Sequence, residues 1–229
     1  MAIKGILFDF NGTLFFDSAF HMEAFRRTLR SYGKPIPTDD YMIHNIFGRT
    51  NETIFLENID PNGTPEQIQK FAHQKESQYR SFCLENPKDF HFTEGAIAFL
   101  DYLKEHSIPY CMATGAEIDN LEFYYEHMNL GAWFPMERIV YTDGSFAGKP
   151  APDIYRLAAE RIGLPCEECL VFEDGTSGII AANRAGAGAV VAVYEEGYPS
   201  PINDKTRVDS LHHNFLFWKD ILADYGLLR

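Results

Sequence analysis

Basic residues are scarce in this sequence. Its 229 residues include 20 lysines and arginines against 33 aspartates and glutamates, which leaves a formal net charge of -13. Binding to a nucleic-acid backbone needs a basic face, and the chain has no run of lysine or arginine that offers one. We therefore expect no nucleic-acid partner. A phosphorylated ligand of so acidic a protein needs a local cation, and a divalent metal is the usual one.

Long hydrophobic runs are missing as well. The chain enters an apolar segment at Ile3 with no basic stretch before it, no apolar run of signal-peptide length and no stretch that approaches a membrane span. We expect a cytoplasmic protein with no membrane partner. The four cysteines form no regular framework and suit a reducing compartment. Cys166 and Cys169 have redox or half-zinc spacing, but they precede an expected strand and no second ligand pair faces them.

Strand and helix patterns alternate along most of the chain. Apolar residues make up 45% of the sequence, enough to bury a substantial core. Short runs rich in β-branched and aromatic residues predict strands at 3–8, 108–113, 138–141, 169–172 and 189–194. Helical patterns occupy 94–105, 117–128, 153–162 and 176–185, with a further packing helix in 214–225. This alternation is typical of parallel βαβ crossovers, in which helices cover both faces of a sheet.

One stretch, from about residue 16 to residue 90, breaks the alternation. It contains a helical pattern that stops at Gly33, and residues 64–67 place a cap, a first-turn proline and a glutamine ahead of another helix. No convincing strand lies within it. We therefore predict a core domain of residues 1–15 and 91–229 and a helical domain, 16–90, inserted after the first strand.

Four polar clusters follow the expected strands. Each has an ordinary explanation on its own: a capped turn, a βα loop, a surface lysine or a helix entry. Because ligands of open α/β sheets bind beyond the carboxyl ends of the strands, their shared location is more informative than any one of them. In chain order the clusters are residues 9–13, Thr114-Gly115, Lys149-Pro150 and Glu173-Asp174-Gly175.

These residue types match the needs of phosphoryl transfer. The reaction takes an anionic oxygen nucleophile, donors around the phosphate oxygens and a fixed positive charge. Asp9 supplies the nucleophile. The Thr114 hydroxyl and the N–H groups of Gly115 and Ala116 at a helix N-terminus supply the donors, and Lys149 supplies the charge.

The same clusters offer ligands for a metal. Asp174, with Glu173 beside it and Asp9 opposite, provides the hard oxygen atoms that Mg²⁺ prefers. We expect Mg²⁺ as the cofactor and a small phosphorylated molecule as the substrate.

The sequence resembles the haloacid dehalogenase superfamily, in the branch of β-phosphoglucomutase-like proteins and small-molecule phosphatases. The likeness rests on the strings "FDFNGTL", "MATGA", "GKPAPDIY" and "FEDGTSGI", in this order, and covers essentially the whole chain. It implies a Rossmann-like α/β core with a central parallel sheet and an inserted helical cap. It also implies a Mg²⁺-dependent enzyme that forms an aspartyl-phosphate on Asp9. The metal would be held by Asp9, the carbonyl of Asn11 and Asp174, with Glu173 as a direct or water-mediated outer ligand.

Asn11 departs from the pattern of the family. Phosphatases and mutases of this family usually have aspartate here, which protonates the leaving alkoxide and then deprotonates the attacking group. An asparagine side chain cannot carry that proton, and the loss is about 10²–10⁴-fold by the usual size of acid–base effects. Three explanations remain open: a natural low-activity or specialised phosphatase, an engineered substitution, and a binding protein that has given up catalysis.

The insert carries three further candidates for substrate binding. His21 matches a histidine that handles the sugar hydroxyl in related mutases, although a surface histidine is an equal alternative. In the segment "FGRTNET" the mutase arginine that grips a distal phosphate would stand at Asn51, whereas Arg49 directly follows Gly48. Losing that grip favours hydrolysis of a monophosphate over isomerisation. We expect a monomeric phosphatase, with a sugar-phosphate mutase or a catalytically silent phosphate-binding protein as the alternatives.

Overall fold

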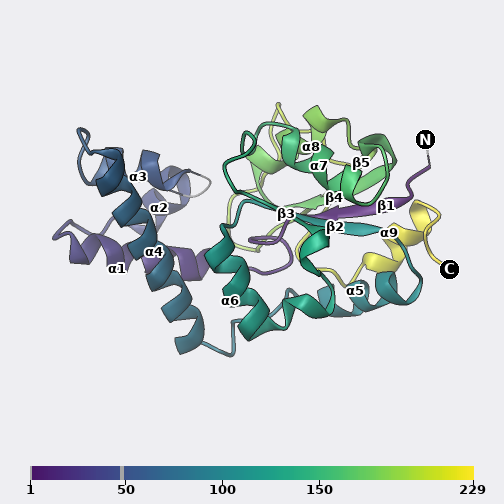
Figure 1. Cartoon of the computed structure of the whole chain (residues 1–229), viewed down its shortest axis with the longest axis horizontal. Coiled ribbons are helices and arrows are strands. Elements are labelled where there is room, and N and C mark those ends of the chain that lie inside the picture. The colour runs from purple at the N-terminus through teal and green to yellow at the C-terminus, as the bar shows by residue number, and fades with distance from the viewer. Residues whose placement is uncertain (1, 47–48) are drawn as a thin grey trace. The chain divides into compact units, whose positions relative to one another are not determined.

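The protein consists of two compact units. The structure is a computed structural model that describes residues 2–46 and 49–229. One unit, called the core unit below, comprises Met1–Phe16 and Phe92–Arg229, and the other, called the insert, comprises Asp17–His91. The insert follows the first strand of the core unit, as Figure 1 shows.

A six-stranded parallel sheet forms the centre of the core unit. Its strand order is β3-β2-β1-β4-β5-β6, and every neighbouring pair runs in parallel. This confirms the α/β fold class with a central parallel sheet. The strands are β1 (Gly5–Phe8), β2 (Tyr110–Thr114), β3 (Ile139–Tyr141), β4 (Cys169–Glu173), β5 (Ala189–Val193) and β6 (Ser210–His212).

Helices pack on both faces of this sheet. In Figure 1, α7 (Asp153–Arg161) and α8 (Thr176–Ala185) lie on one face, and α5 (Ala96–Glu105) and α9 (Trp218–Asp224) lie on the other. The first face is packed with small and aliphatic side chains, many of them alanines. Aromatic rings fill the second, where the Phe8 ring lies 5.2 Å from Phe172 and 5.5 Å from Phe99. The remaining elements are α6 (Ile118–Met128) and the 3-10 turns η1 (Leu130–Ala132), η2 (Met136–Arg138) and η3 (Cys166–Glu168).

The insert is helical throughout its described elements. It comprises α1 (Ser18–Ser31), α2 (Asp39–Asn45), α3 (Asn51–Asn58) and α4 (Pro65–Glu85). The predicted start of α4 is confirmed, since the Thr64 side chain accepts from the N–H of Gln67 and the Gln67 side chain accepts from the N–H of Thr64. Phe71 on α4 packs against Phe55 and Phe25. These rings form the centre of the insert.

The expected elements differ from the observed ones mainly at their ends. The C-terminal helix is shorter than predicted, because the chain turns through 214–217 before α9 begins. β6 was not predicted: it is a three-residue edge strand, only partly buried, with no apolar run to mark it. Within the described residues, no helix is both long and apolar enough to cross a membrane.

Candidate active site

A buried carboxylate stands just beyond the end of β1. Asp9 is 5% exposed, and its backbone N–H still bonds to the carbonyl of Phe172 on β4. Its Oδ1 atom accepts from the Nζ of Lys149 at 2.5 Å. The same ammonium group donates to Oε1 of Glu173, also at 2.5 Å. A single lysine therefore bridges two buried carboxylates that come from neighbouring strands.

Asp174 and Thr13 complete the acidic side of the site. The Thr13 hydroxyl lies 3.2 Å from Asp9 Oδ2 and 3.3 Å from Asp174 Oδ1, so it can donate to one at a time. Gly12 allows this approach: its φ is +80°, and a Cβ there would lie 2.2 Å from Asp174 Oδ2. Gly178 on α8 has the same use, because a Cβ there would lie 1.6 Å from Glu173 Oε1.

Burial and neighbouring charges set the protonation of this cluster. Burial raises the pKa of Asp9 to about 7; the Lys149 ammonium opposes that rise and the Glu173 carboxylate adds to it. Burial lowers the pKa of Lys149, but Asp9 and Glu173 more than offset this and leave it above its ordinary value. Lys149 is therefore a permanent positive charge in this site.

The end of β2 lies at the same edge of the sheet. Met112 of β2 pairs in parallel with Phe8 of β1, so Thr114 reaches the edge at which Asp9 stands. Thr114 is fully buried, and its hydroxyl accepts from the N–H of Ala116. Gly115 has open space beside it, since a Cβ at this position would meet no atom within 4 Å. The sheet thus brings all four predicted clusters of the core unit to one edge.

Two tyrosines, absent from the predicted site, contact it. Tyr155 on α7 donates from its hydroxyl to Glu173 Oε1 at 3.0 Å, and burial, with Glu173 next, holds its pKa well above the ordinary value. Tyr124 on α6 accepts at its hydroxyl from Nδ2 of Asn11 at 2.8 Å. Tyr155 ends the string "GKPAPDIY" and could have been found from it, whereas nothing in the sequence relates Tyr124 to Asn11.

Within the insert, the candidates make other contacts. Arg49 forms an ion pair with Glu57 at 2.6 Å, and Asn51 at the start of α3 donates to Glu76 at 3.5 Å. Phe47 and Gly48, from the same segment, lie outside the described residues. The roles of Arg49 and Asn51 in substrate binding stay predictions.

His21 belongs to a polar cluster inside the insert. Its Nε2 lies 3.1 Å from Asp17 Oδ2, and its Nδ1 lies 2.7 Å from the Nζ of Lys75. An ammonium group has only hydrogen atoms to offer, so Nδ1 must accept and Nε2 carries the proton. Lys75 and Asp17 are buried, and Tyr79 donates to Asp17 at 2.8 Å. The sequence reasoning missed these three residues, because they are spread over 62 positions.

The acidic cluster of the core unit fits a divalent cation. Asp9, Glu173 and Asp174 each offer a carboxylate oxygen within 4.8 Å of the others. When all three carboxyl groups are ionised, the Lys149 ammonium offsets only one of their negative charges. Carboxylate oxygens with excess negative charge are the donors that Mg²⁺ prefers.

Comparisons with known proteins agree with this geometry. The model of the haloacid dehalogenase-like hydrolase family matches residues 3–186. The chain is 30% identical to a phosphorylated carbohydrates phosphatase of Thermotoga maritima, over 83% of this chain and 85% of that one. It is also 30% identical to the fructose-1-phosphate phosphatase YqaB of Escherichia coli, over 81% and 94%.

A solved structure shows the same relationship. A family IA, variant 3 hydrolase of Entamoeba histolytica has a TM-score of 0.85 and 30% sequence identity, and the match covers 93% of this chain and 94% of that one. Together with the family model, which spans well over half of the sequence, this places the protein by descent as well as by fold. The chain belongs to the haloacid dehalogenase-like hydrolases.

Proposed function

We propose that this protein is a Mg²⁺-dependent phosphatase that hydrolyses a monophosphate ester of a small polyhydroxy molecule through a phosphoryl group carried on Asp9. One observation carries the proposal: a buried carboxylate at the end of β1 shares an edge of the sheet with Lys149, Thr114 and two further carboxylates. Two relatives at 30% identity are named as sugar-phosphate phosphatases, which supports the substrate class.

Asp9 is the proposed nucleophile. Its carboxylate attacks the phosphorus atom, the ester oxygen leaves, and water then attacks the phosphoryl group on Asp9 to release phosphate. The leaving oxygen takes its proton from solvent water, and the water that attacks the phosphoryl group gives up a proton to solvent. Because Asn11 cannot donate that proton as a carboxylic acid does, hydrolysis of an alkyl ester such as a polyol phosphate is expected to be slow, and esters with better leaving groups are expected to react faster.

The other residues bind and orient. Lys149 holds Asp9 by a charge-assisted hydrogen bond and places positive charge where the phosphate oxygens gather. The Thr114 hydroxyl and the N–H of Gly115 are donors for those oxygens, whereas the N–H of Ala116 already donates to Thr114 and lies before the start of α6. Asp9, Asp174 and the carbonyl of Asn11 would hold Mg²⁺, with Glu173 as an outer ligand. Bound there, Mg²⁺ supplies charge neutralisation for the phosphate oxygens.

Asn11 favours one other function. A protein that binds a phosphorylated ligand and does not turn it over has no use for a proton carrier at this position. A sugar-phosphate mutase is less well supported, since it must hold two phosphates in turn and Arg49 is engaged with Glu57.

Phosphate release separates these functions. Sugar, polyol, acyl and aryl phosphates are incubated with the protein and Mg²⁺, with and without EDTA. The proposal predicts phosphate release that EDTA abolishes and excess Mg²⁺ restores. Mg²⁺-dependent binding with no release from any ester would identify the silent binding protein, and an isomerised sugar phosphate without net release would identify a mutase.

A further inference from the structure

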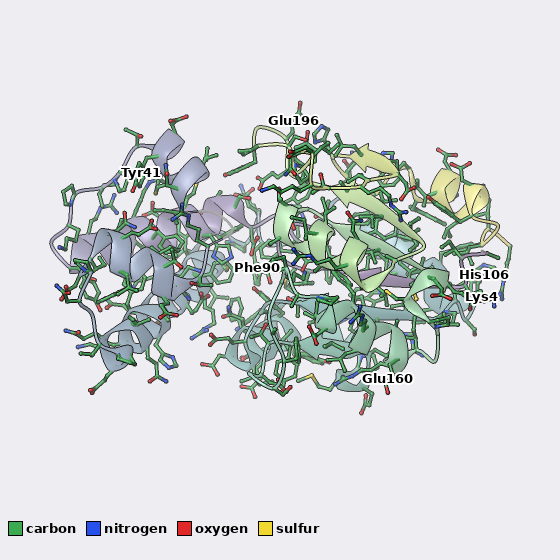
Figure 2. All side chains as sticks on the ribbon, turned by 90° about the horizontal axis from the view of Figure 1, so that it is seen from above. Lys4, Tyr41, Phe90, His106, Glu160 and Glu196 are labelled. Carbon is green, nitrogen blue, oxygen red and sulfur yellow. The ribbon has the colours of Figure 1, made fainter. Side chains whose placement is uncertain are left out.

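A cavity lies at the edge of the core sheet opposite the candidate active site. It has a volume of about 620 Å³ and is formed by the loop that enters β2, the segment that precedes β3 and the end of α7. Lys4, before β1, and His106, at the end of α5, are labelled at this end of the core unit in Figure 2. All predicted site residues of the core unit lie at the other edge, so the phosphoryl-transfer chemistry does not use this cavity.

Three cations line the cavity. Lys104, Arg138 and Arg161 are all among its lining residues, in a protein whose net charge is -13. No lining residue is an aspartate or a glutamate. Among the residues that the structure describes, none of the three cations has a carboxylate oxygen within 4.0 Å. Positive charge is therefore concentrated here with no carboxylate in ion-pair contact, while Asp101 accepts from the lining residue Trp133 and Arg161 helps to lower the pKa of Asp143.

Backbone carbonyls and a ring hold these cations in place. Lys104 Nζ donates to the carbonyl of Ala132 at 2.9 Å, and Arg161 donates to the carbonyls of Met136 and Ile139. The Arg138 guanidinium lies 5.2 Å from the centre of the Tyr110 ring. Such contacts orient each of these exposed cations without pairing it with a carboxylate, so the remaining N–H groups are suited to an anion.

The rest of the lining is largely apolar or aromatic. Trp133 contributes a partly exposed ring, whose Nε1 donates to Asp101 at 2.7 Å. Tyr110, whose hydroxyl donates to the carbonyl of Trp133 at 2.8 Å, is only 1% exposed. Further apolar side chains come from Leu103, Ile108, Pro109, Pro135 and Ile162. A ligand that matches this lining combines a flat apolar body with an anionic group.

From this arrangement we infer that the cavity binds a planar organic anion, with Lys104 and Arg138 at the anionic group and the apolar lining around the ring. The size fits one small molecule, since ligand pockets are typically about 300–1,000 Å³. The ligand class is an aromatic sulfonate, carboxylate or phosphate. This site is separate from the proposed active site, and the inference does not depend on the phosphatase function.

Naphthalene-1-sulfonate is the probe that tests the inference, because it has no phosphoryl group for the active site to transfer. Isothermal titration of the full chain is expected to show one saturable site. Uncharged 1-naphthalenemethanol and ring-free methanesulfonate are expected to bind at least about tenfold more weakly, the loss that removing a charge-assisted hydrogen bond or the apolar body implies.

Variants locate the site. Lys104→Gln and Arg138→Gln are each expected to weaken sulfonate binding about tenfold. The matched controls Lys219→Gln and Arg156→Gln remove the same charges from elsewhere in the core unit and are expected to leave binding unchanged, as is Lys149→Gln in the proposed active site. Thermal melts verify that each variant is folded. If Arg138→Gln does not fold, Lys104→Gln alone serves to test the site.

Three results would overturn the inference. These are no binding of the sulfonate up to its solubility limit, binding that survives both cavity variants, and binding that is lost in Lys149→Gln. A fourth is equal binding of the uncharged naphthyl compound, which would show that the cations do not select an anion.

Discussion

Replacing Asn11 by aspartate is expected to raise turnover by about 10²–10⁴-fold, equivalent to about 2.7–5.4 kcal/mol of transition-state free energy. In the structure the Asn11 side chain donates to the Tyr124 hydroxyl at 2.8 Å. An aspartate has the same shape, and its carboxylate can accept from that hydroxyl, so the substitution needs no rearrangement. Asp9 stands two residues away, and its negative charge raises the pKa of a new carboxyl group, as a general acid at neutral pH requires.

The assay for this gain is kcat/KM for phosphate release from one alkyl phosphate and one aryl phosphate. A larger gain is expected on the alkyl ester, because its leaving group needs the proton more. Asn214→Asp is the matched control: it adds the same charge to the core unit, and its side-chain oxygen can still accept from the N–H of Leu216. An Asn11→Asp variant no faster than Asn214→Asp on either ester would refute the reasoning.

The remaining predictions concern the supporting residues. Lys149→Gln is expected to lower kcat by about 10²–10³-fold, as loss of one preorganised cation does, and an unchanged kcat would contradict its role. Gly12→Ala is expected to lower both stability, measured by urea denaturation, and turnover. Gly12 has a φ of +80°, and a Cβ there would lie 2.2 Å from Asp174 Oδ2. Gly33→Ala is the comparison, since Gly33 has a φ of +65° but open space around it. It is expected to lose less stability than Gly12→Ala, from backbone strain alone. The four buried cysteine thiols are expected to react with a thiol reagent at pH 8 only as the chain unfolds, because burial raises their pKa, that of Cys166 to about 11. Thiols of the unfolded chain ionise near pH 8.5, so the buried thiols contribute fully to the free energy of unfolding below that pH and less as pH rises above it. Urea denaturation at pH 7 and pH 10 is expected to show the lower stability at pH 10.

The arrangement of the core could be predicted because parallel strands leave a strong local pattern. A strand buried on both faces is a short apolar run, and the polar residues that follow each run must meet at one edge of the sheet. Asp9, Thr114, Lys149 and Glu173 were found in this way. β6 could not be predicted in this way, because a partly buried edge strand needs no apolar run.

Contacts between side chains distant in sequence could not be predicted. The pairing of Asn11 with Tyr124 spans 113 positions and depends on how α6 packs beside the turn after β1. The cluster of Asp17, His21, Lys75 and Tyr79 depends on the register of α1 against α4, which helical periodicity does not specify. The three cations of the cavity at the opposite edge of the sheet likewise come from separate segments that only the folded sheet brings together.

The proposed mechanism requires a phosphoryl group covalently attached to Asp9. The direct measurement is to quench the protein in acid during turnover of a good substrate, such as an acyl phosphate with Mg²⁺, and to map the modification by mass spectrometry. We expect one phosphoryl group on Asp9, labile to hydroxylamine and absent from Asp9→Ala, which also loses all turnover. Phosphate release that persists in Asp9→Ala, or a phosphoryl group on another residue, would contradict it.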